Sequence, residues 1–448
     1  MMPHIKRFLF LAAFFLTIID SLCATHNGSR YFPFFEKPED YGYNDKHVVD
    51  TSFFMTFAST AFSRSRGTVG IPELWGKYDL NDIIFSLQAV NPAYVNPLIG
   101  KYGPGFDTVK APFKVSQRIR SRGLVLSYKY PYKITEEHRF LFGLWAPIMH
   151  LDTTARYQFL SKDFQEQTEP SLPRVLTDNE KRTLSQDMDK FRRQTHDVIG
   201  FTQNSWQKGG LGDIDIFAQY NFFTDHKLLM RSINLNARLG LILPTGAFAD
   251  NDVPTSVSFM GNGHWGLYFD FVPEFELKQD LKVGFMFGFL HQFKETRLRR
   301  MATYQEPDIF SSLIGKIQVD PGFTFKISPY VILENLTDGL SLQGRYTYVR
   351  HEHDTFRDAR KDKTIASYLS RIPTVDINQE AINANIADKE NKTSRRSHYV
   401  TLQFLYDTKK ALNNWSFDPT IYVAYDIPIG GSAICKTHQV SCGVELHF

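Results

Sequence analysis

The alternation of apolar and polar side chains is the clearest pattern in the chain. From residue 265 to residue 277 every odd position is apolar (Trp, Leu, Phe, Phe, Pro, Phe, Leu), whereas the even positions include Asp and two Glu. Successive side chains of a strand point to opposite faces, so this segment is predicted to be a strand with one apolar and one largely polar face. It is longer than the roughly five or six residues of an ordinary soluble strand and long enough to cross a bilayer at a tilt.

The same alternation recurs along most of the chain and predicts about twelve strands. Their centres lie near residues 56, 125, 144, 218, 236, 271, 288, 326, 346, 403, 421 and 442. The connections near 132–137, 224–229, 279–280, 335–338 and 408–413 are short. Those near 63–117, 152–210, 244–262, 297–315 and 354–396 are long, and the one near 428–434 is brief and rich in Gly. Short turns that alternate with long loops are typical of outer-membrane barrels. Residues 68–116 either fold inward as a loop or hold two further strands, which would make fourteen.

Composition supports a barrel in a membrane. The chain has 448 residues, of which 39 are Phe and 21 are Tyr, a larger aromatic content than a soluble core requires. After residue 20 there is no run of about 20 apolar residues, which excludes a helical membrane bundle. Strands cross lipid only when they close into a barrel, because every backbone hydrogen bond must be satisfied. We therefore predict an all-β, antiparallel transmembrane β-barrel over residues 48–448, with short periplasmic turns, long extracellular loops and its excess aromatic side chains facing lipid.

The N-terminus has the pattern of an export signal. Basic residues at positions 6 and 7 precede an apolar run over 8–19 and small residues at 21, 23 and 24. This pattern predicts a secretory signal peptide over residues 1–24, cleaved on export to a bacterial outer membrane. Leu22, which is not small, argues against lipid attachment at Cys23. Residues 25–47 are then predicted to be a periplasmic segment. With Cys435 and Cys442 the chain has only 3 Cys, too few for a disulfide framework.

Two segments carry resemblances to known proteins. The C-terminus, SCGVELHF, resembles the β-signal of bacterial outer-membrane proteins, with Ser441, Gly443, Leu446 and Phe448 at its four positions. That resemblance implies recognition by the barrel-assembly machinery. Residues 210–223 (GLGDIDIFAQYNFF) and 239–248 (LGLILPTGAF) are together similar to a strand pair in outer-membrane transporter barrels of aromatic-degradation, or meta-cleavage, pathways. This narrower resemblance implies transport.

The polar faces of the strands define a candidate lumen. Twelve strands about 4.8 Å apart and tilted by about 40° give a backbone radius of about 12 Å, which leaves either a narrow pore or an interior filled by side chains. The predicted lining includes Asp213, Asp215, Arg238, Asp270, Glu274, Lys282, Lys326, Arg345, Asp418 and Glu445. Both signs of charge occur, so strong ion selectivity is not predicted. Such a lining either positions a polar or zwitterionic solute or forms a mutually ion-paired interior.

Two long loops are predicted to carry helices. Residues 177–194 start with the capping-box pattern of Thr177 and Glu180 and place Leu184, Met188 and Phe191 on one face. Residues 358–369 show a less regular version of the pattern. These helices either gate the mouth of the barrel or decorate its surface.

Some histidines are candidate sites of chemistry. His351, His353 and His398 flank one long loop and are candidates to meet as metal ligands. A polar strand rim accounts for them better, and we predict no metal and no cofactor. His291 is the outward candidate for an outer-membrane lipid hydrolase, but the sequence around it shows no nucleophile motif. We predict that the protein is not an enzyme.

The most favoured function is a channel or transporter for passive passage of small solutes through a narrow polar lumen. The alternative is a non-transporting structural or adhesive surface protein anchored by the barrel, and a lipid hydrolase is less favoured still. The expected partners are outer-membrane lipids, the barrel-assembly machinery and small solutes. The net charge of +3, with no basic run interleaved with aromatics, argues against nucleic acid. The sequence does not determine the solute, whether the pore is open, or the oligomeric state.

Overall fold

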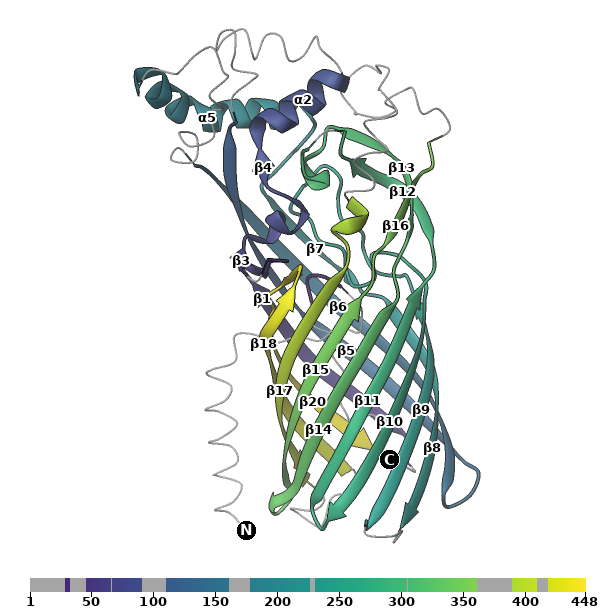
Figure 1. Cartoon of the computed structure of the whole chain (residues 1–448). Helices are drawn as coiled ribbons and strands as arrows, with labels where there is room; N and C mark the ends of the chain where they lie inside the picture. The colour runs from purple at the N-terminus through teal and green to yellow at the C-terminus, as the bar shows by residue number, and fades with distance from the viewer. Residues whose placement is uncertain are drawn as a thin grey trace.

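The computed structural model shows a closed barrel of twelve antiparallel strands (Figure 1). It describes residues 29–32, 46–65, 67–90, 110–160, 178–225, 230–303, 305–360, 389–408 and 418–448. Around the barrel the strand order is β5-β1-β20-β18-β17-β15-β14-β11-β10-β9-β8-β6, and a pairing of β6 with β5 closes the ring. The predicted fold and the predicted number of strands are both confirmed.

All twelve predicted strand centres fall within these barrel strands. The strands are β1 (Val48–Ala58), β5 (Pro112–Lys133), β6 (His138–Phe159), β8 (Ile214–Asp225), β9 (Ser232–Leu243), β10 (Gly266–Lys278), β11 (Leu281–Gln292), β14 (Thr324–Thr337), β15 (Leu340–His351), β17 (Arg395–Asp407), β18 (Asp418–Ser432) and β20 (His438–His447).

The barrel wall exposes apolar side chains and buries polar ones. Outward positions include Phe269, Phe285 and Phe404, whose exposed fractions are 41%, 44% and 48%. Alternate positions on the same strands, such as Asp270 and Gln403, are buried inside the barrel. This arrangement is the inverse of a soluble sandwich and matches a barrel surrounded by lipid. None of the helices in the described part of the chain is long and apolar enough to cross a membrane.

Short turns and the C-terminus share one end of the barrel. The turn between β10 and β11 consists of Gln279 and Asp280, and Asp280 takes a positive φ of 62°, as a tight hairpin turn requires. At the same end the backbone of His47 exchanges hydrogen bonds with Phe448 (3.0 and 3.1 Å), and their rings stack. The long connections therefore all leave from the opposite, outer end.

The long connections fold into a packed cap over the outer end (Figure 1). The cap contains β2 (Ala61–Phe62), β3 (Thr68–Val69), η2 (Ile71–Trp75), β4 (Tyr78–Asp79), α2 (Leu80–Val90), α5 (Asp178–Val198) and β7 (Ser205–Leu211). It also contains β12 (Glu295–Met301), η4 (Asp308–Phe310), β13 (Leu313–Asp320), β16 (Thr355–Asp358) and β19 (Ile434–Cys435). Side chains from α2, α5 and the sheet of β12, β13 and β16 share one apolar core.

The helix predicted over residues 177–194 is confirmed as α5. Met188 and Phe191 bury 99% or more of their surface in the cap core, whereas Thr177 and the side chain of Leu184 lie outside the described residues. Of the second predicted helix, Asp358 ends β16, and residues 361–369 lie outside the described residues. Within residues 68–116, β4 pairs only with the outer end of β5 and adds nothing to the ring, so twelve strands is the correct count and fourteen is not.

Residues 29–32 correct the expectation of a periplasmic segment over 25–47. Cys435 donates its backbone N–H to the Arg30 carbonyl (3.1 Å), which places this short stretch among the outer loops. Phe32 is buried with the inward-facing Phe54 and Trp145. An aromatic residue is most stable where it removes its ring from water, and here that place is inside the outer half of the barrel. The predicted signal peptide lies outside the described residues.

Candidate functional site

The predicted lumen residues point into the barrel and are buried there. Asp215, Arg238, Asp270, Lys326 and Arg345 each expose 4% of their surface or less, and Glu274 and Glu445 expose 8% and 5%. Lys282 is partly buried near the short-turn end and pairs with Glu334 (2.9 Å). The side chain of Asp418 lies outside the described residues, although its backbone pairs with His447.

Ion pairs and hydrogen bonds link these residues across the interior. Lys326 Nζ lies 3.2 Å from Asp270, Arg345 lies 3.9 Å from Asp426, and Lys129 lies 4.0 Å from Glu445. Tyrosines add further bonds: Tyr268 donates to Asp215 and Tyr330 donates to Glu274, both at 2.8 Å. Around these residues the interior is ion-paired and hydrogen-bonded, which was one of the two interpretations of the polar lining.

Glycines on neighbouring strands make room for the inward aromatic rings. A Cβ added to Gly240 would lie 2.2 Å from the ring of Tyr268, and one added to Gly284 would lie 2.2 Å from the ring of Tyr330. Gly443 is a position of the C-terminal β-signal, and a Cβ added there would lie 2.5 Å from the hydroxyl of Tyr422. These rings lie flat against the wall and fill space that an open pore would leave to water. The role of Ser441, Gly443, Leu446 and Phe448 in assembly stays a prediction.

Asp213 lies at the outer end of the barrel and has a different role from the one predicted. Its carboxylate accepts backbone N–H groups from Gly246 (2.9 Å) and Gly261 (2.7 Å), both in the connection between β9 and β10. A carboxylate that accepts two backbone hydrogen bonds fixes a loop conformation. Asp213 therefore anchors an outer loop next to the cavity described below.

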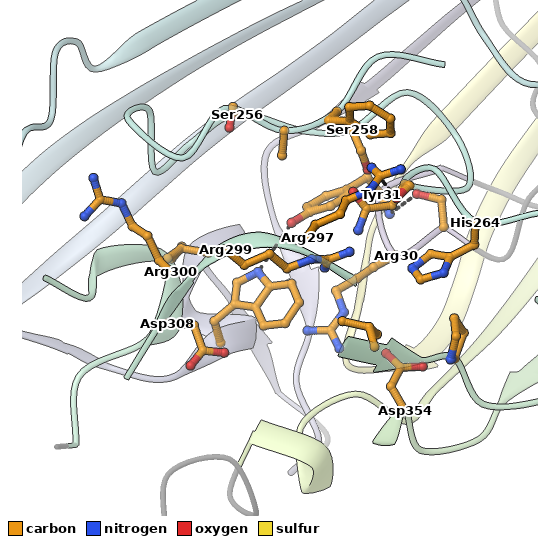
Figure 2. A pocket seen from close by; sticks show the side chains of 18 of the residues that line it. Arg30, Tyr31, Ser256, Ser258, His264, Arg297, Arg299, Arg300, Asp308 and Asp354 are labelled. Carbon is orange, nitrogen blue, oxygen red and sulfur yellow. Dashed lines mark hydrogen bonds between the residues drawn. The ribbon is translucent and has the colours of Figure 1, made fainter. Parts of the chain in front are cut away.

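A cavity of about 250 Å³ lies among the outer loops, at the ends of β11, β15 and β17 (Figure 2). Its walls come from residues 29–31, the end of η2, the connection between β9 and β10, β12, η4 and the segment around β16. Gln292 and His351, which are inward-facing residues at the outer ends of β11 and β15, form part of its lining. Phe248 and Leu298 also line it and are about half exposed (44% and 49%), which indicates that it opens toward solvent.

Arginines dominate the polar part of this cavity. Arg30 donates to the carbonyls of Lys392 (2.7 Å) and Thr393 (3.3 Å), and its guanidinium lies over the ring of Trp75. Arg297 donates to the carbonyls of Asn262 and Gly263 and lies over Phe248. Stacking on aromatic rings keeps these cations fixed in a partly apolar surrounding.

The sequence did not single out this cavity. Its arginines lie in long loops without the alternation that identified the strands, and residues far apart in the chain form its walls. The one local signal is TRLRRM in residues 296–301, where Arg297 and Arg299 share a face of β12. The sequence alone did not place that face against residues 29–31 or residue 395.

The histidines do not meet in the way that a metal site would require. His351 faces the interior, where it contacts Thr324 (2.7 Å) and Asp354 (2.8 Å). His398 lies on the outward face of β17, because its register partner is Tyr348 and its Nδ1 contacts the hydroxyl of Tyr346 (2.6 Å). His353 contacts the carbonyl of Glu390. The candidate ligand set was wrong because His351 and His398 lie on opposite faces of the wall.

Comparisons with known proteins give fold neighbours. No family model matches the chain, and no curated protein matches its sequence. Among solved structures, an outer-membrane channel from Pseudomonas putida F1 is 7% identical with a TM-score of 0.48, covering 92% of this chain and 99% of that one. A Pseudomonas aeruginosa FadL homologue is 9% identical with a TM-score of 0.32, covering 96% and 99%. The β domain of the Bordetella autotransporter BrkA is 8% identical with a TM-score of 0.36, covering 90% and 99%.

The strand pairing and the outward apolar face define the architecture on their own. A closed, antiparallel, even-stranded ring with lipid-facing aromatics and one end of short turns is the architecture of barrels in bacterial outer membranes. The chain is therefore a transmembrane β-barrel of the outer-membrane type.

Proposed function

We propose that the protein is an outer-membrane channel or transporter that admits small solutes through the outer cavity and the polar interior of the barrel. The observation that carries the proposal is that the cavity adjoins the barrel interior. Gln292 and His351 line the cavity, and they are also the outermost inward-facing residues of β11 and β15. Further along the same face of β15 lie Thr347, Arg345 and Gln343, all buried. Val349 and Leu290 add apolar side chains to these two faces, and the buried polar residues beside them support a route from the cavity into the barrel.

Passage along this route requires side chains to move. The ion pair of Lys326 and Asp270 and the rings of Tyr268 and Tyr330 occupy the interior. Side chains change rotamer far faster than a folded wall rearranges, so transient openings between them are the simplest means of passive passage. Such a route favours small solutes and low conductance over the large flux of an open porin.

The packed interior also favours the alternative function. A barrel filled with paired side chains serves well as an anchor for its loops, as a structural or adhesive surface protein requires. The non-enzymatic character of the protein, its contacts with lipids and the assembly machinery, and the cleavage of its signal peptide stay predictions as well.

Reconstitution discriminates the two functions. The full-length mature protein is refolded into liposomes, and swelling is followed with uncharged and charged solutes of graded size, alongside conductance in planar bilayers. The proposal expects swelling with the smallest solutes and a cutoff as size increases. Swelling and conductance equal to protein-free membranes with every solute, for both the native protein and a variant lacking the rings of Tyr268 and Tyr330, would favour the anchor.

A further inference from the structure

We propose that the outer cavity is a binding site for a small organic anion, a solute with a carboxylate group on a compact apolar body. The proposal rests on the proposed function, because it names the class of solute that the cavity would take up. It is carried by the charge of the cavity, by one guanidinium group in particular, and by the apolar surfaces beside it.

Positive charge exceeds negative charge in the lining. Among the described residues that line the cavity, six are Arg or Lys and three are Asp. Two of the acids are engaged at its wall: Asp308 pairs with Lys389 (2.9 Å), and Asp354 accepts from the Gly322 N–H (3.0 Å) and contacts His351. An anion entering the cavity therefore meets a net positive field in a partly desolvated space, where charge attraction is stronger than in water.

The alternation of β12 selects the arginine that faces the ligand. Arg297 and Arg299 share one face of the strand, and Arg300 lies on the other, where it donates to the carbonyls of Ser311 (2.7 Å) and Ile199 (3.2 Å). Figure 2 shows Arg30, Arg297 and Arg299 converging on one space while Arg300 points away from it.

Arg299 differs from its neighbours in its partners. Arg30 and Arg297 direct their terminal nitrogens at backbone carbonyls. The terminal nitrogens of Arg299 lie 3.0 and 3.1 Å from the side chain of Asn262, whose amide satisfies them when its oxygen points toward the guanidinium. Its hydrogen-bond partner there is therefore a neutral amide. A carboxylate is the stronger, bidentate partner for a planar guanidinium and would displace or join the amide.

Burial raises the cost of these charges in the empty cavity. Removal from water lowers the pKa of Arg299 to about 10, and the positive charge of Arg297 adds to the effect, whereas the negative charges of Asp354, Glu295 and Asp308 oppose it. Burial also lowers the pKa of Arg30. A group whose charged form is disfavoured by desolvation gains most from a bound charge of opposite sign. An anionic ligand would thus stabilise the cavity as well as occupy it.

The rest of the lining suits an apolar body of limited size. Tyr31, Trp75, Val253, Met260 and Leu298 contribute apolar surface. The volume of about 250 Å³ lies just below the roughly 300–1,000 Å³ of pockets for drug-sized molecules. A single ring or short branched chain with one carboxylate fits these surfaces, whereas an inorganic anion would leave them unused.

Binding of benzoate to the full-length protein in detergent tests the site by titration calorimetry. Benzyl alcohol has the same ring without the charge, and inorganic phosphate has charge without the ring. We expect benzoate to bind at least about tenfold more tightly than either, since charge-assisted hydrogen bonds are worth roughly 1.5–3 kcal/mol. Equal affinity for benzyl alcohol, or tighter binding of phosphate, would overturn the inference.

Variants assign the binding to Arg299. Arg299→Gln should weaken benzoate binding by roughly 10- to 100-fold. Lys316→Gln should leave it unchanged, because Lys316 is an exposed residue of β13 outside the cavity lining. Arg299→Lys keeps the charge and should recover part of the affinity, which guards against a fold defect, and the unfolding midpoint of each variant is recorded. Full affinity in Arg299→Gln would contradict the site.

The binding assay separates this inference from the proposed function. Benzoate binding in detergent without any solute flux in liposomes would keep the anion site and reject transport. Flux of small solutes with no benzoate binding would keep the channel and reject the anion site.

Discussion

At the scale of single residues, the contact between Gly284 and Tyr330 tests how tightly the barrel interior is packed. A Cβ at position 284 would lie 2.2 Å from the ring of Tyr330, which is 97% buried and held by its bond to Glu274. We expect Gly284→Ala to destabilise the barrel by about 1–3 kcal/mol, the usual cost of overpacking. Urea unfolding in detergent micelles measures the change.

Gly344 supplies the matched control for this prediction. It also lies in a barrel strand, but a Cβ there would meet no atom within 4 Å. Gly344→Ala should be neutral or slightly stabilising, since Ala loses less backbone entropy than Gly. Equal stability of the two variants would mean that the ring of Tyr330 moves freely and that the interior is looser than described.

A buried histidine, His196, makes the stability of the cap depend on pH. His196 Nδ1 lies 3.2 Å from Arg192 Nη1 and His196 Nε2 lies 2.7 Å from the Tyr78 hydroxyl. Because a guanidinium only donates, Nδ1 must accept, so the folded ring is neutral and Nε2 donates to Tyr78. Burial lowers the pKa of His196 well below its usual 6.5, and the charges of Arg192 and Arg300 lower it further.

The sign of the pH effect follows from this lowered pKa. Below pH 6.5 the unfolded chain binds a proton at His196 that the folded cap does not bind. The stability of the cap therefore falls as the pH falls, until the pH reaches the pKa of His196 in the folded cap. The loss is about 1.4 kcal/mol for each pH unit. Hydrogen exchange of the α5 amides between pH 7.5 and 5.5 should show this loss in the native protein and not in His196→Gln. Parallel pH profiles for the two would show that the fold does not lower the pKa of His196.

At the scale of elements, α5 is predicted to support the cap without supporting the barrel. Phe191 is fully buried in the cap core. The side chains that β5 and β6 add to this core, Phe113, Val115 and Ala155, lie beyond the pairing of these strands with β1 and β8. Phe191→Ala should cost the cap about 3–5 kcal/mol through the lost apolar contacts and the cavity that remains. Limited proteolysis should then cut within residues 178–198, while the band of the folded barrel on an unheated gel is unchanged.

Lys190 is the control for this prediction, since its side chain is exposed on the same helix. Lys190→Ala should keep the native resistance to protease. If Phe191→Ala also abolished the folded barrel band, cap and barrel would be one cooperative unit, and the cap would then be unable to move independently during solute entry.

The barrel elements were predictable because their signal is local. In a strand with lipid on one side and paired polar groups on the other, apolar and polar residues alternate along the sequence. This alternation predicted β10, β11 and the two-residue turn between them. The helix α5 was also predictable from a local signal, namely its capping pattern and the spacing of Met188 and Phe191. Within 68–116 the segments β3 and β4 are two residues each, too short for any period to appear.

The cavity was not predictable because it depends on contacts between distant segments. Arg30 reaches it from the N-terminal stretch and Arg299 from β12, some 270 residues later. The expected periplasmic position of residues 29–32 was reasonable from their place before the first strand, but tertiary burial of Phe32 decides their location. The ion-paired state of the lumen also depended on register: Lys326 meets Asp270 across β11, where Gly288 leaves the space between them.

At the scale of the whole molecule, the filled interior limits what the barrel conducts. Tyr268 and Tyr330 expose 7% and 3% of their surface and close the space between the wall and the central ion pairs. The double variant Tyr268→Ala with Tyr330→Ala removes both rings, whose atoms are the nearest neighbours of a Cβ at Gly240 and Gly284. We expect its single-channel conductance and its liposome-swelling cutoff to rise severalfold above those of the native protein, because pore flux increases steeply with lumen width.

The control removes two tyrosines from the other side of the wall. Tyr346 and Tyr348 lie on the outward face of β15, where they contact His398. Tyr346→Ala with Tyr348→Ala should leave conductance unchanged while lowering stability in the membrane, since interfacial aromatics anchor a barrel. If the inward and outward pairs had equal effects on conductance, the current would come from a damaged wall. If the inward pair had none, the route would not pass through the middle of the barrel, and solute would have to leave the outer cavity by another way or not cross at all.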